Sequence, residues 1–137
     1  MNMTGEVVII GAGIAGLEVA GCLAKEGIKV TLIEKENEVG GHLKNWYHLF
    51  PDHRDSSQVL EYLKKKATHN GIRLLTGNHL VDFEKKRDRF VITTNEVGEI
   101  RADAVVVTTG FDLFRAERKE EYGYGIYDDV ITSADLE

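Results

Sequence analysis

The stretch GAGIAG, from Gly11 to Gly16, decides the fold of this chain. Before it, Glu6 to Ile10 is a short apolar run that is typical of a buried parallel strand. After it, apolar residues recur at helical spacing from Ile14 to Glu26, and Gly27 ends the helix. A second apolar strand, Lys29 to Glu34, follows. Strand, helix and strand together occupy about 30 residues, which predicts a right-handed βαβ unit.

The glycines of this stretch stand at its first, third and sixth positions, the pattern of a loop that binds a dinucleotide. Gly11 permits a tight turn, Gly13 lets the backbone approach a pyrophosphate, and Gly16 lets the helix pack close to the strand. The free N–H groups of the first helical turn then face the anion, and the helix dipole favours it there. We therefore predict pyrophosphate contacts, mostly through backbone atoms, from Gly11, Gly13, Ile14, Ala15 and Gly16. The alternative is a glycine-rich turn that binds no ligand.

An acidic residue, Glu34, ends the second strand 18 residues after Gly16. A carboxylate at this place accepts hydrogen bonds from a ribose diol and repels a 2′-phosphate, which disfavours NADP. The alternative is a solvated glutamate. Because strand, glycines, helix, second strand and acid occur in register, the sequence favours the binding site.

A second helix and a third strand are predicted after a polar loop. The loop runs from Glu36 to Asp55 and contains histidines and aromatic residues. Ser56 or Ser57 is the predicted N-cap of a helix that continues to about His69. Ile72 to Leu75 then has the composition of a short strand.

Beyond this strand the hydrophobic period changes to two. Three antiparallel strands are predicted, Asn78 to Glu84, Arg89 to Thr94 and Glu99 to Ala102. Ala104 to Thr108 is strongly apolar and is predicted to be a buried strand of the main sheet, and the tail from Phe111 is predicted to be loop with one short helix or strand. The predicted fold class is α/β, a Rossmann-like FAD/NAD(P)-binding domain whose parallel sheet carries a three-stranded antiparallel meander.

Composition narrows the partners of the chain. Its 137 residues include 17 Lys and Arg against 23 Asp and Glu, a net charge of −6. This length suits a single domain, and the acidic balance argues against a nucleic-acid partner. The longest apolar stretch, Val7 to Leu17, falls short of the roughly 20 residues of a membrane span, so we expect no membrane insertion. One cysteine, Cys22, allows no intramolecular disulfide and fits a reducing, cytoplasmic setting.

No metal site and no catalytic residue is predicted. His42, His48 and His53 lie six and five residues apart on a loop, which matches no familiar zinc spacing. Cys22 lies in the middle of a helix, where a small packed apolar residue is the expected role. We find no residue with the role of a general acid, a general base or a nucleophile.

Two further elements point to a flavin. Gly40-Gly41 follows the second strand by a short loop, and Thr108-Thr109-Gly110 ends the apolar strand after the meander. With these elements in this order, the chain resembles the glutathione-reductase-like flavoproteins of the FAD/NAD(P)-binding superfamily. The resemblance implies FAD, rather than NAD, as the cofactor.

More narrowly, the chain resembles the A subunit of the heterodisulfide reductases, which is their flavoprotein. It is also similar to the related flavoprotein subunits of quinone-interacting membrane-bound oxidoreductase complexes. The matching stretches are EK at 34–35, GGHL at 40–43, LFP at 49–51, TGFDLF at 109–114, RKEEYGYG at 118–125 and VITS at 130–133. They span essentially the whole chain. Family members run much longer, and the nicotinamide-domain-like insertion, the second Gly-Asp motif and the cysteine clusters of the family do not occur in these residues.

The resemblance implies cofactor contacts beyond the glycine loop, namely Glu34, Lys35, Gly41, His42, Leu43, Leu80, Thr108, Thr109 and Gly110. The first two would meet the adenosine ribose and the adenine edge, and the next three would lie near the pyrophosphate and ribityl. Leu80 would meet the adenine through its backbone or is a plain core leucine. The last three would close the site, or else they pack on the glycine loop without touching ligand.

Two functions follow from these observations. The first is an FAD-binding module of an electron-transfer oxidoreductase that does not turn over alone, with iron–sulfur or other redox protein subunits as the partners that the resemblance implies. The second is a non-catalytic nucleotide-binding or docking module that binds only the ADP moiety, or NAD, and the missing second Gly-Asp motif favours it. In either case we expect residues 1–137 to form a single dinucleotide (FAD)-binding domain within a larger flavoprotein architecture.

Overall fold

A four-stranded parallel sheet lies at the centre of the computed structural model, which describes residues 5–137. Its strands are β1 (Glu6–Ile10), β2 (Lys29–Ile33), β5 (Ile72–Leu75) and β9 (Ala104–Val107), in the order β5-β2-β1-β9. All three pairings are parallel. The predicted strand–helix–strand unit is therefore confirmed, and β1 occupies a central position from which the glycine loop starts.

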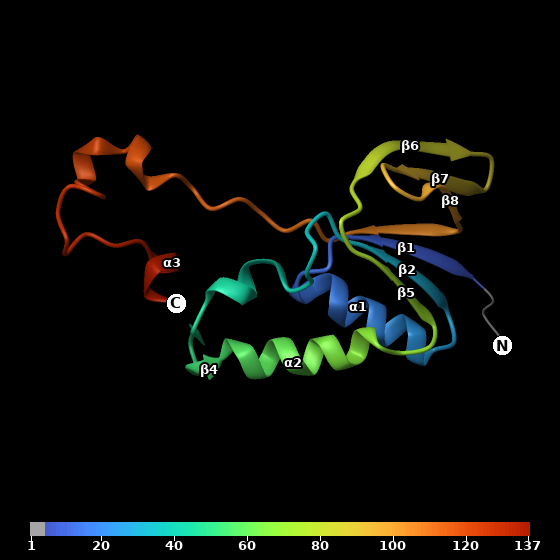
Figure 1. Cartoon of the computed structure of the whole chain (residues 1–137), viewed down its shortest axis with the longest axis horizontal. Helices are drawn as coiled ribbons and strands as arrows, with labels where there is room; N and C mark the ends of the chain where they lie inside the picture. Colours follow the sequence, from blue (N-terminus) through green and yellow to red (C-terminus); the bar gives the residue numbers. More distant parts are fainter. Residues whose placement is uncertain (1–4) are drawn as a thin grey trace.

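Two helices lie on one side of this sheet (Figure 1). Helix α1 (Ile14–Lys25) packs against the sheet, and α2 (Ser56–Ala67) packs against α1. The core between these elements includes Ile9, Leu17 and Leu32, which are fully buried. In the part of the chain that the structure describes, every helix is too short or too polar to cross a bilayer.

The predicted meander covers the other side of the sheet (Figure 1). It consists of β6 (Leu80–Lys86), β7 (Arg89–Thr94) and β8 (Gly98–Ala102), which pair in antiparallel order. A second core cluster joins Val8 and Ile33 of the parallel sheet to Ile92 and Ile100 of the meander. Successive residues of a strand point to opposite faces, so Val8 and Ile9 serve different cores.

The start of α2 corrects one prediction. Its N-cap is Asp55, not Ser56 or Ser57, because the Asp55 carboxylate accepts hydrogen bonds from the backbone N–H of Ser57 at 2.8 Å and of Gln58 at 3.3 Å. Ser56 is buried instead, and its hydroxyl donates to the Trp46 carbonyl. The loop before α2 also contains short elements, the 3-10 helix η1 (Gly41–Asn45) and the strand pair β3 (His48–Leu49) and β4 (Arg54–Asp55).

The position of β9 in the sheet corrects a second prediction. The sequence predicts a buried strand here, but β9 is an edge strand, and Val107 is 67% exposed. Apolar side chains show that a strand joins a parallel sheet, but they do not fix its place in the strand order.

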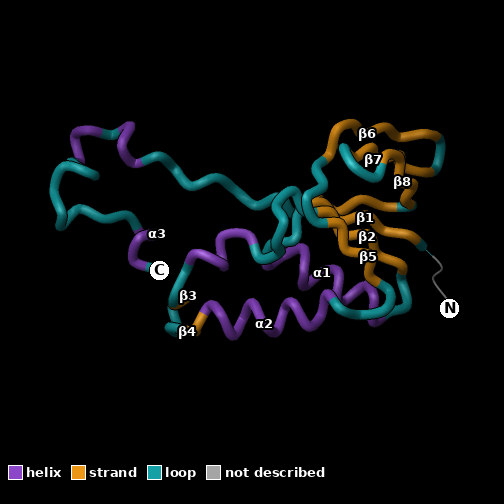
Figure 2. Tube along the Cα trace, viewed as in Figure 1, coloured by secondary structure: helices purple, strands orange, loops and turns teal. Residues whose placement is uncertain are grey.

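After β9 the chain leaves the sheet in an extended path and returns its end toward β3 (Figure 2). This path carries three short helices, η2 (Ala116–Arg118), η3 (Glu120–Tyr122) and α3 (Ser133–Leu136). The sequence predicts one short element in this tail, so the local structure is richer than expected.

An ion pair joins the two helices on their partly exposed side. Lys66 of α2 donates to both carboxylate oxygens of Glu18 on α1, at 2.5 and 2.6 Å, and the lysine side chain is only 12% exposed. Cys22, expected to be packed, is exposed, with its sulfur 3.6 Å from Glu18 Oε1. The hydrogen bond from Lys66 lowers the pKa of Glu18, and the same contact raises the pKa of Lys66.

We expect Glu18→Gln to lower the melting temperature at pH 7. The folded-state pKa of Glu18 lies below the ordinary value of 4.5, so the stabilisation is present above that value and is lost as pH falls through the folded pKa. The difference between wild type and variant should therefore shrink in acid. Glu61→Gln is the matched control, because its ion pair with Lys65 is exposed on both sides and contributes little. Equal effects of the two substitutions at pH 7 would contradict the assignment.

Candidate functional site

The glycine loop connects β1 to α1 at the carboxyl edge of the sheet. Gly11 has a φ of +103°, and its N–H donates to the Ile33 carbonyl at 2.8 Å. A Cβ at this position would collide with the carbonyl of Thr108. Glycine is therefore required here both by backbone conformation and by the close approach of the chain that follows β9.

Gly16 meets the same loop from the helix side. A Cβ at Gly16 would overlap the Gly11 carbonyl oxygen and would lie 2.9 Å from Thr108 Oγ1. The first turn of α1 can approach the loop this closely only because position 16 has no side chain. The packing role predicted for this glycine is confirmed.

Gly13 differs from both of these neighbours. Its φ is −77°, which any residue adopts, and a Cβ there would meet nothing within 4 Å. The space above Gly13 is thus open and is filled by nothing in the described residues. Steric contacts within the chain do not require glycine at this position. The missing side chain at Gly13 instead leaves room for a bound ligand.

The first turn of α1 begins beside this open space and has free hydrogen-bond donors. The helix has no side-chain cap and no acidic residue in its first turn. Its first N–H with a backbone partner is that of Leu17, which donates to the Gly13 carbonyl at 3.0 Å. Within residues 5–137, no acceptor is assigned to the N–H groups of Ile14, Ala15 and Gly16. Unpartnered N–H groups at a helix N-terminus favour an anion, so the loop fits a phosphate group.

Glu34 lies directly beside the loop. Its side chain is only 6% exposed, and its two carboxylate oxygens accept hydrogen bonds from Ala12 N at 2.8 Å and from Glu36 N at 3.0 Å. The alternative of a solvated glutamate is therefore wrong. Each carboxylate oxygen keeps a second lone pair, so the group can still accept hydrogen bonds from a ribose diol.

We expect Glu34→Gln to weaken ADP binding by about 1–3 kcal/mol, or roughly 5- to 150-fold, the range for hydrogen bonds to a charged group. The amide would also turn one donor toward the N–H groups of Ala12 and Glu36, so some loss of stability should accompany it. Calorimetric titration with ADP measures the effect. Glu36→Gln, two residues away and exposed, is the control and should bind like wild type. Unchanged affinity in Glu34→Gln would remove the ribose assignment.

The glycine pair after β2 closes on the loop. Gly40 N donates to the Ala12 carbonyl at 2.8 Å, and a Cβ at Gly41 would lie 3.4 Å from Gly13 Cα. Leu43, a predicted contact, has its side chain in the core at 1% exposure, so only its backbone can face a ligand. The fully buried Ala12 joins Glu34 and Gly40 through backbone atoms.

His42 lies on the tail side of this glycine pair. Its Nε2 is 2.7 Å from the Phe111 carbonyl, and its ring stacks on Trp46 with centroids 5.8 Å apart. The aromatic side chain of Trp46 therefore packs against His42.

The end of β9 supports the glycine loop from the other side. Thr108 Oγ1 lies 2.8 Å from the Gly11 carbonyl and 3.1 Å from the Ile10 carbonyl, and the hydroxyl donates to them. The Thr108 side chain is thereby occupied within the protein, which agrees with the alternative that this strand end packs on the loop. Thr109 and Gly110 follow at the same edge, and both are exposed.

The connection from β5 to β6 lies beside Glu34. Asn78 N donates to the Glu34 carbonyl and Gly77 N to the Glu36 carbonyl, both at 2.9 Å. Leu80 begins β6 just beyond and is 39% exposed, so it is not a plain core leucine. Lys35, which follows Glu34, is exposed. Asn78, which sequence reasoning did not single out, is 7% exposed, and its Oδ1 has no hydrogen-bond partner among the described residues.

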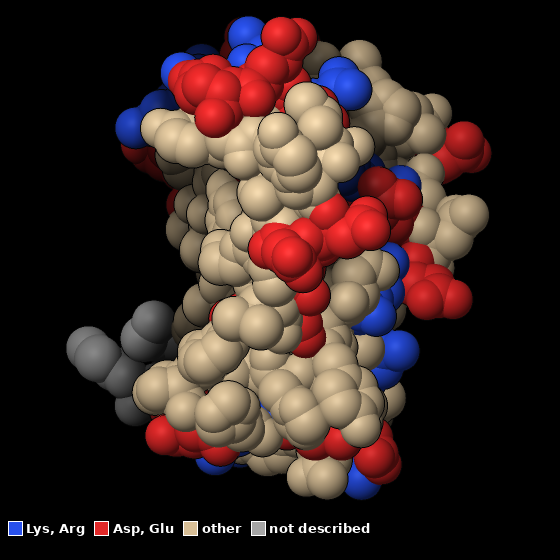
Figure 3. All heavy atoms as spheres, turned by 90° about the vertical axis from the view of Figure 1, so that its left-hand side faces the viewer, with Lys and Arg blue, Asp and Glu red and all other residues tan. Residues whose placement is uncertain are grey.

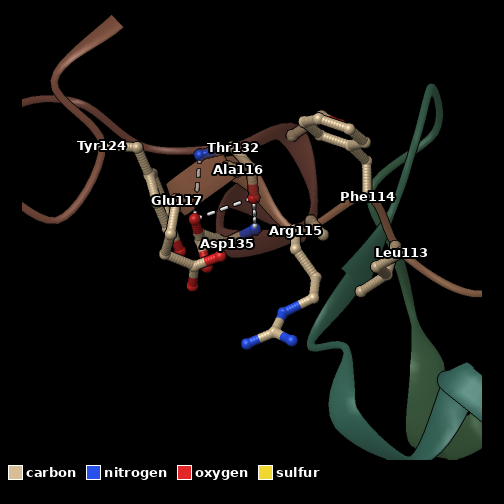
Figure 4. Close-up of a pocket in the computed structure, with 10 residues that line it drawn as sticks. Leu113, Phe114, Arg115, Ala116, Glu117, Tyr124, Thr132 and Asp135 are labelled. Atoms are coloured by element: carbon tan, nitrogen blue, oxygen red, sulfur yellow. Dashed lines mark hydrogen bonds between the residues drawn. The ribbon is translucent and has the colours of Figure 1, made fainter. Parts of the chain in front are cut away.

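A separate cavity of about 430 Å³ lies in the tail, between Leu113–Glu117, Tyr124 and Thr132–Asp135 (Figure 4). Asp135 accepts hydrogen bonds from the N–H and hydroxyl of Thr132, both at 2.8 Å. A further hydrogen bond to Asp135 raises the pKa of Tyr124. The glycine loop contributes nothing to this cavity. Across residues 5–137, no three His, Cys, Asp or Glu side chains are grouped to hold a metal ion.

The glycine loop, the buried Glu34 and the parallel sheet define the class as a Rossmann-type dinucleotide-binding domain. The family model described as pyridine nucleotide-disulphide oxidoreductase matches residues 5–135. The chain belongs to this family. The predicted fold class is confirmed by this match.

Curated relatives confirm the narrower resemblance. The A subunit of the ferredoxin/F420H2-dependent CoB-CoM heterodisulfide reductase of Methanosarcina acetivorans is 26% identical over 212 aligned positions, which cover 96% of this chain and 27% of the relative. An iron-sulfur A subunit of the CoB-CoM heterodisulfide reductase of Methanopyrus kandleri is 24% identical, with 100% of this chain and 33% of the relative covered. The chain thus spans about a third or less of these relatives.

Solved structures share the fold. The L-proline dehydrogenase from P. horikoshii superposes with a TM-score of 0.70 at 27% identity, covering 79% of this chain and 23% of that one. A thioredoxin reductase from Lactococcus lactis gives a TM-score of 0.71 at 24% identity, covering 88% and 41%.

Proposed function

We propose that this chain is the FAD-binding module of an electron-transfer oxidoreductase related to the heterodisulfide reductases. One observation supports it most: unpartnered N–H groups at the open Gly13 position lie in the same loop that holds the buried Glu34 carboxylate. A diphosphate and a ribose diol would satisfy these groups together. The family and the relatives then favour FAD among the dinucleotides.

The residues of the chain act as binding groups in this proposal. Backbone N–H groups of Ile14, Ala15 and Gly16 would hold the pyrophosphate, and Glu34 would hold the adenosine ribose. Gly41 would border the pyrophosphate because it lies against Gly13. FAD, when bound, supplies the electron transfer, and the protein supplies position and environment.

The wider assembly is part of the same proposal. The chain would act as one dinucleotide-binding domain in a larger cytoplasmic flavoprotein architecture. Its electron partners would be iron–sulfur or other redox proteins, by analogy with relatives named as ferredoxin-dependent and as iron-sulfur subunits. The residues at the glycine loop include no general acid, general base or nucleophile, so turnover would require the partners.

A second candidate is a module that binds only ADP. The described contacts gather where the adenosine and pyrophosphate would lie, whereas Thr108 is engaged with the loop, and Gly110 is exposed. Such a module would gain little from the flavin end of FAD.

Titration of the purified chain with FAD, ADP and NADH separates the two candidates. Flavin absorbance and heat are followed together. FAD binding at least about tenfold tighter than ADP, a difference of about 1.4 kcal/mol, would support the flavin module. Equal affinities would support the ADP module. Absence of binding by all three would refute both.

A further inference from the structure

The tail, residues 111–137, is attached to the rest of the protein at two places. His42 Nε2 donates to the Phe111 carbonyl at 2.7 Å, and the N–H groups of Tyr47 and His48 donate to a backbone oxygen of Glu137 at 2.5 and 3.1 Å. Within residues 5–137, no other hydrogen bond or ion pair joins the tail to the body. Between the two attachments the tail arches away from the sheet (Figure 2).

Both attachments lie on one short segment, residues 40–48. The start of this segment touches the glycine loop, through Gly40 N to the Ala12 carbonyl at 2.8 Å and through the approach of Gly41 to Gly13. The segment therefore has the candidate pyrophosphate site on one side and the tail on the other. A change in the conformational order of residues 40–48 would therefore affect both the candidate pyrophosphate site and the tail.

His42 makes the first connection by a defined donor. A carbonyl only accepts hydrogen bonds, so Nε2 must carry the proton in the contact with Phe111. The ring lies between Trp46 and Phe111, with centroids 5.8 and 5.1 Å away. Hydrogen bond and ring contacts together tie the tail's first residue to the segment that borders Gly13.

The remainder of the tail has little to hold it. Tyr122 is 69% exposed and Ile126 67%, and the tail has three basic against eight acidic residues, a net charge of −5. At this end of the molecule, groups of acidic side chains lie among uncharged residues (Figure 3). Repulsion among these carboxylates opposes compaction, so the position of the tail depends on its two attachments.

We propose that His42 is a positioning residue that couples occupancy of the glycine loop to the position of the tail. This inference rests on the proposed function. A diphosphate held over Gly13 orders residues 40–48. The hydrogen bond from His42 to the Phe111 carbonyl then fixes the start of the tail. A ligand shifts a conformational equilibrium only by its difference in affinity for the two states, and contact with the glycine pair supplies that difference.

Limited digestion with trypsin tests the coupling, with ADP as the probe. The exposed tail offers cleavage after Arg115, Arg118 and Lys119, while Lys85 and Lys86 in the β6–β7 hairpin serve as an internal control. Saturating ADP should slow cleavage in the tail about fivefold. A ligand that stabilises the state in which the tail is attached lowers the population of the detached state, and trypsin cleaves the detached state. Cleavage in the hairpin should not change.

Two variants complete the test, each digested at saturation after its own ADP affinity is measured by calorimetry. His42→Leu should abolish the protection of the tail by ADP. His42→Gln should restore most of it, because its amide N–H can still donate to the Phe111 carbonyl. A merely structural role for His42 would not give protection that depends on both the ligand and the donor.

The outcomes separate the two proposals. ADP binding without slower tail cleavage in wild type overturns the coupling and leaves the nucleotide site intact. Equal protection of wild type and His42→Leu also overturns it. If neither ADP nor FAD binds, the proposed function fails and the coupling fails with it.

Discussion

Gly13→Val should abolish nucleotide binding while the fold is kept. The wild-type backbone at Gly13 has a φ of −77°, so valine introduces no conformational strain there. A Cβ would meet no atom of the protein within 4 Å, so the new side chain fits without clashing. It would, however, occupy the open space beside the unpartnered N–H groups of Ile14 and Ala15, and a pyrophosphate could no longer reach them.

The expected loss is large because several charged hydrogen bonds disappear together. Each is worth about 1.5–3 kcal/mol, so two of them correspond to roughly 100-fold or more in affinity. Calorimetry with ADP and FAD measures the loss, and thermal unfolding measures the fold. Gly5→Val is the matched control, because it adds the same side chain at the far end of β1, where the nearest atom is Asp103 Oδ2 at 3.8 Å. Nucleotide binding by Gly13→Val at wild-type strength would remove the pyrophosphate from this loop.

The glycine loop could be predicted from the sequence because backbone sterics leave few alternatives there. The left-handed backbone at Gly11 and the helix packed against the Gly11 carbonyl each require a glycine, so the pattern GAGIAG indicates the geometry of the loop. The alternating periods of the meander and the apolar runs of the parallel strands act in the same way. Their existence and type were predictable, and most of their ends shifted by only one or two residues.

Other features were not predictable because they use backbone atoms or the position of an element. Ala12 and Asn78 border Glu34 through backbone groups that any residue would supply. Asp55 and Ser56 are both good caps, and only the path of the chain before α2 selects the carboxylate. Cys22 has the composition of a packed residue, but its side of α1 faces Glu18 and solvent instead of the sheet.

The tail shows the same limit on a larger scale. Its resemblance to the heterodisulfide reductase flavoproteins could be recognised residue by residue, but its structure could not, because no period of two or 3.6 runs through it. Its two attachments use backbone oxygens of Phe111 and Glu137, which any residue would supply, so the sequence does not indicate them. Patterns of side chains therefore do not predict attachments whose acceptors are backbone atoms.

Gly16→Ala should destabilise the fold, in contrast to the expectation from helix propensity. Gly16 lies in the first turn of α1, where alanine is intrinsically favoured over glycine by up to about 1 kcal/mol in a helix. A Cβ at Gly16 would nevertheless overlap the Gly11 carbonyl oxygen and crowd Thr108 Oγ1 at 2.9 Å. Both of these neighbours are held by the sheet, since Thr108 bonds to Ile10 and Gly11.

Relief of this overlap requires α1 to move away from the loop. Overpacking of this kind costs about 1–3 kcal/mol and sometimes more, which exceeds the gain in helix propensity. Chemical denaturation of Gly16→Ala and Gly13→Ala measures the difference, since both add one methyl group within a single helical turn. Gly16→Ala should lose stability even without ligand, whereas Gly13→Ala should stay close to wild type in stability and lose affinity instead. If Gly16→Ala were more stable than wild type, helix propensity would be the dominant effect, and the close contact of α1 with the loop would not be a requirement of the fold.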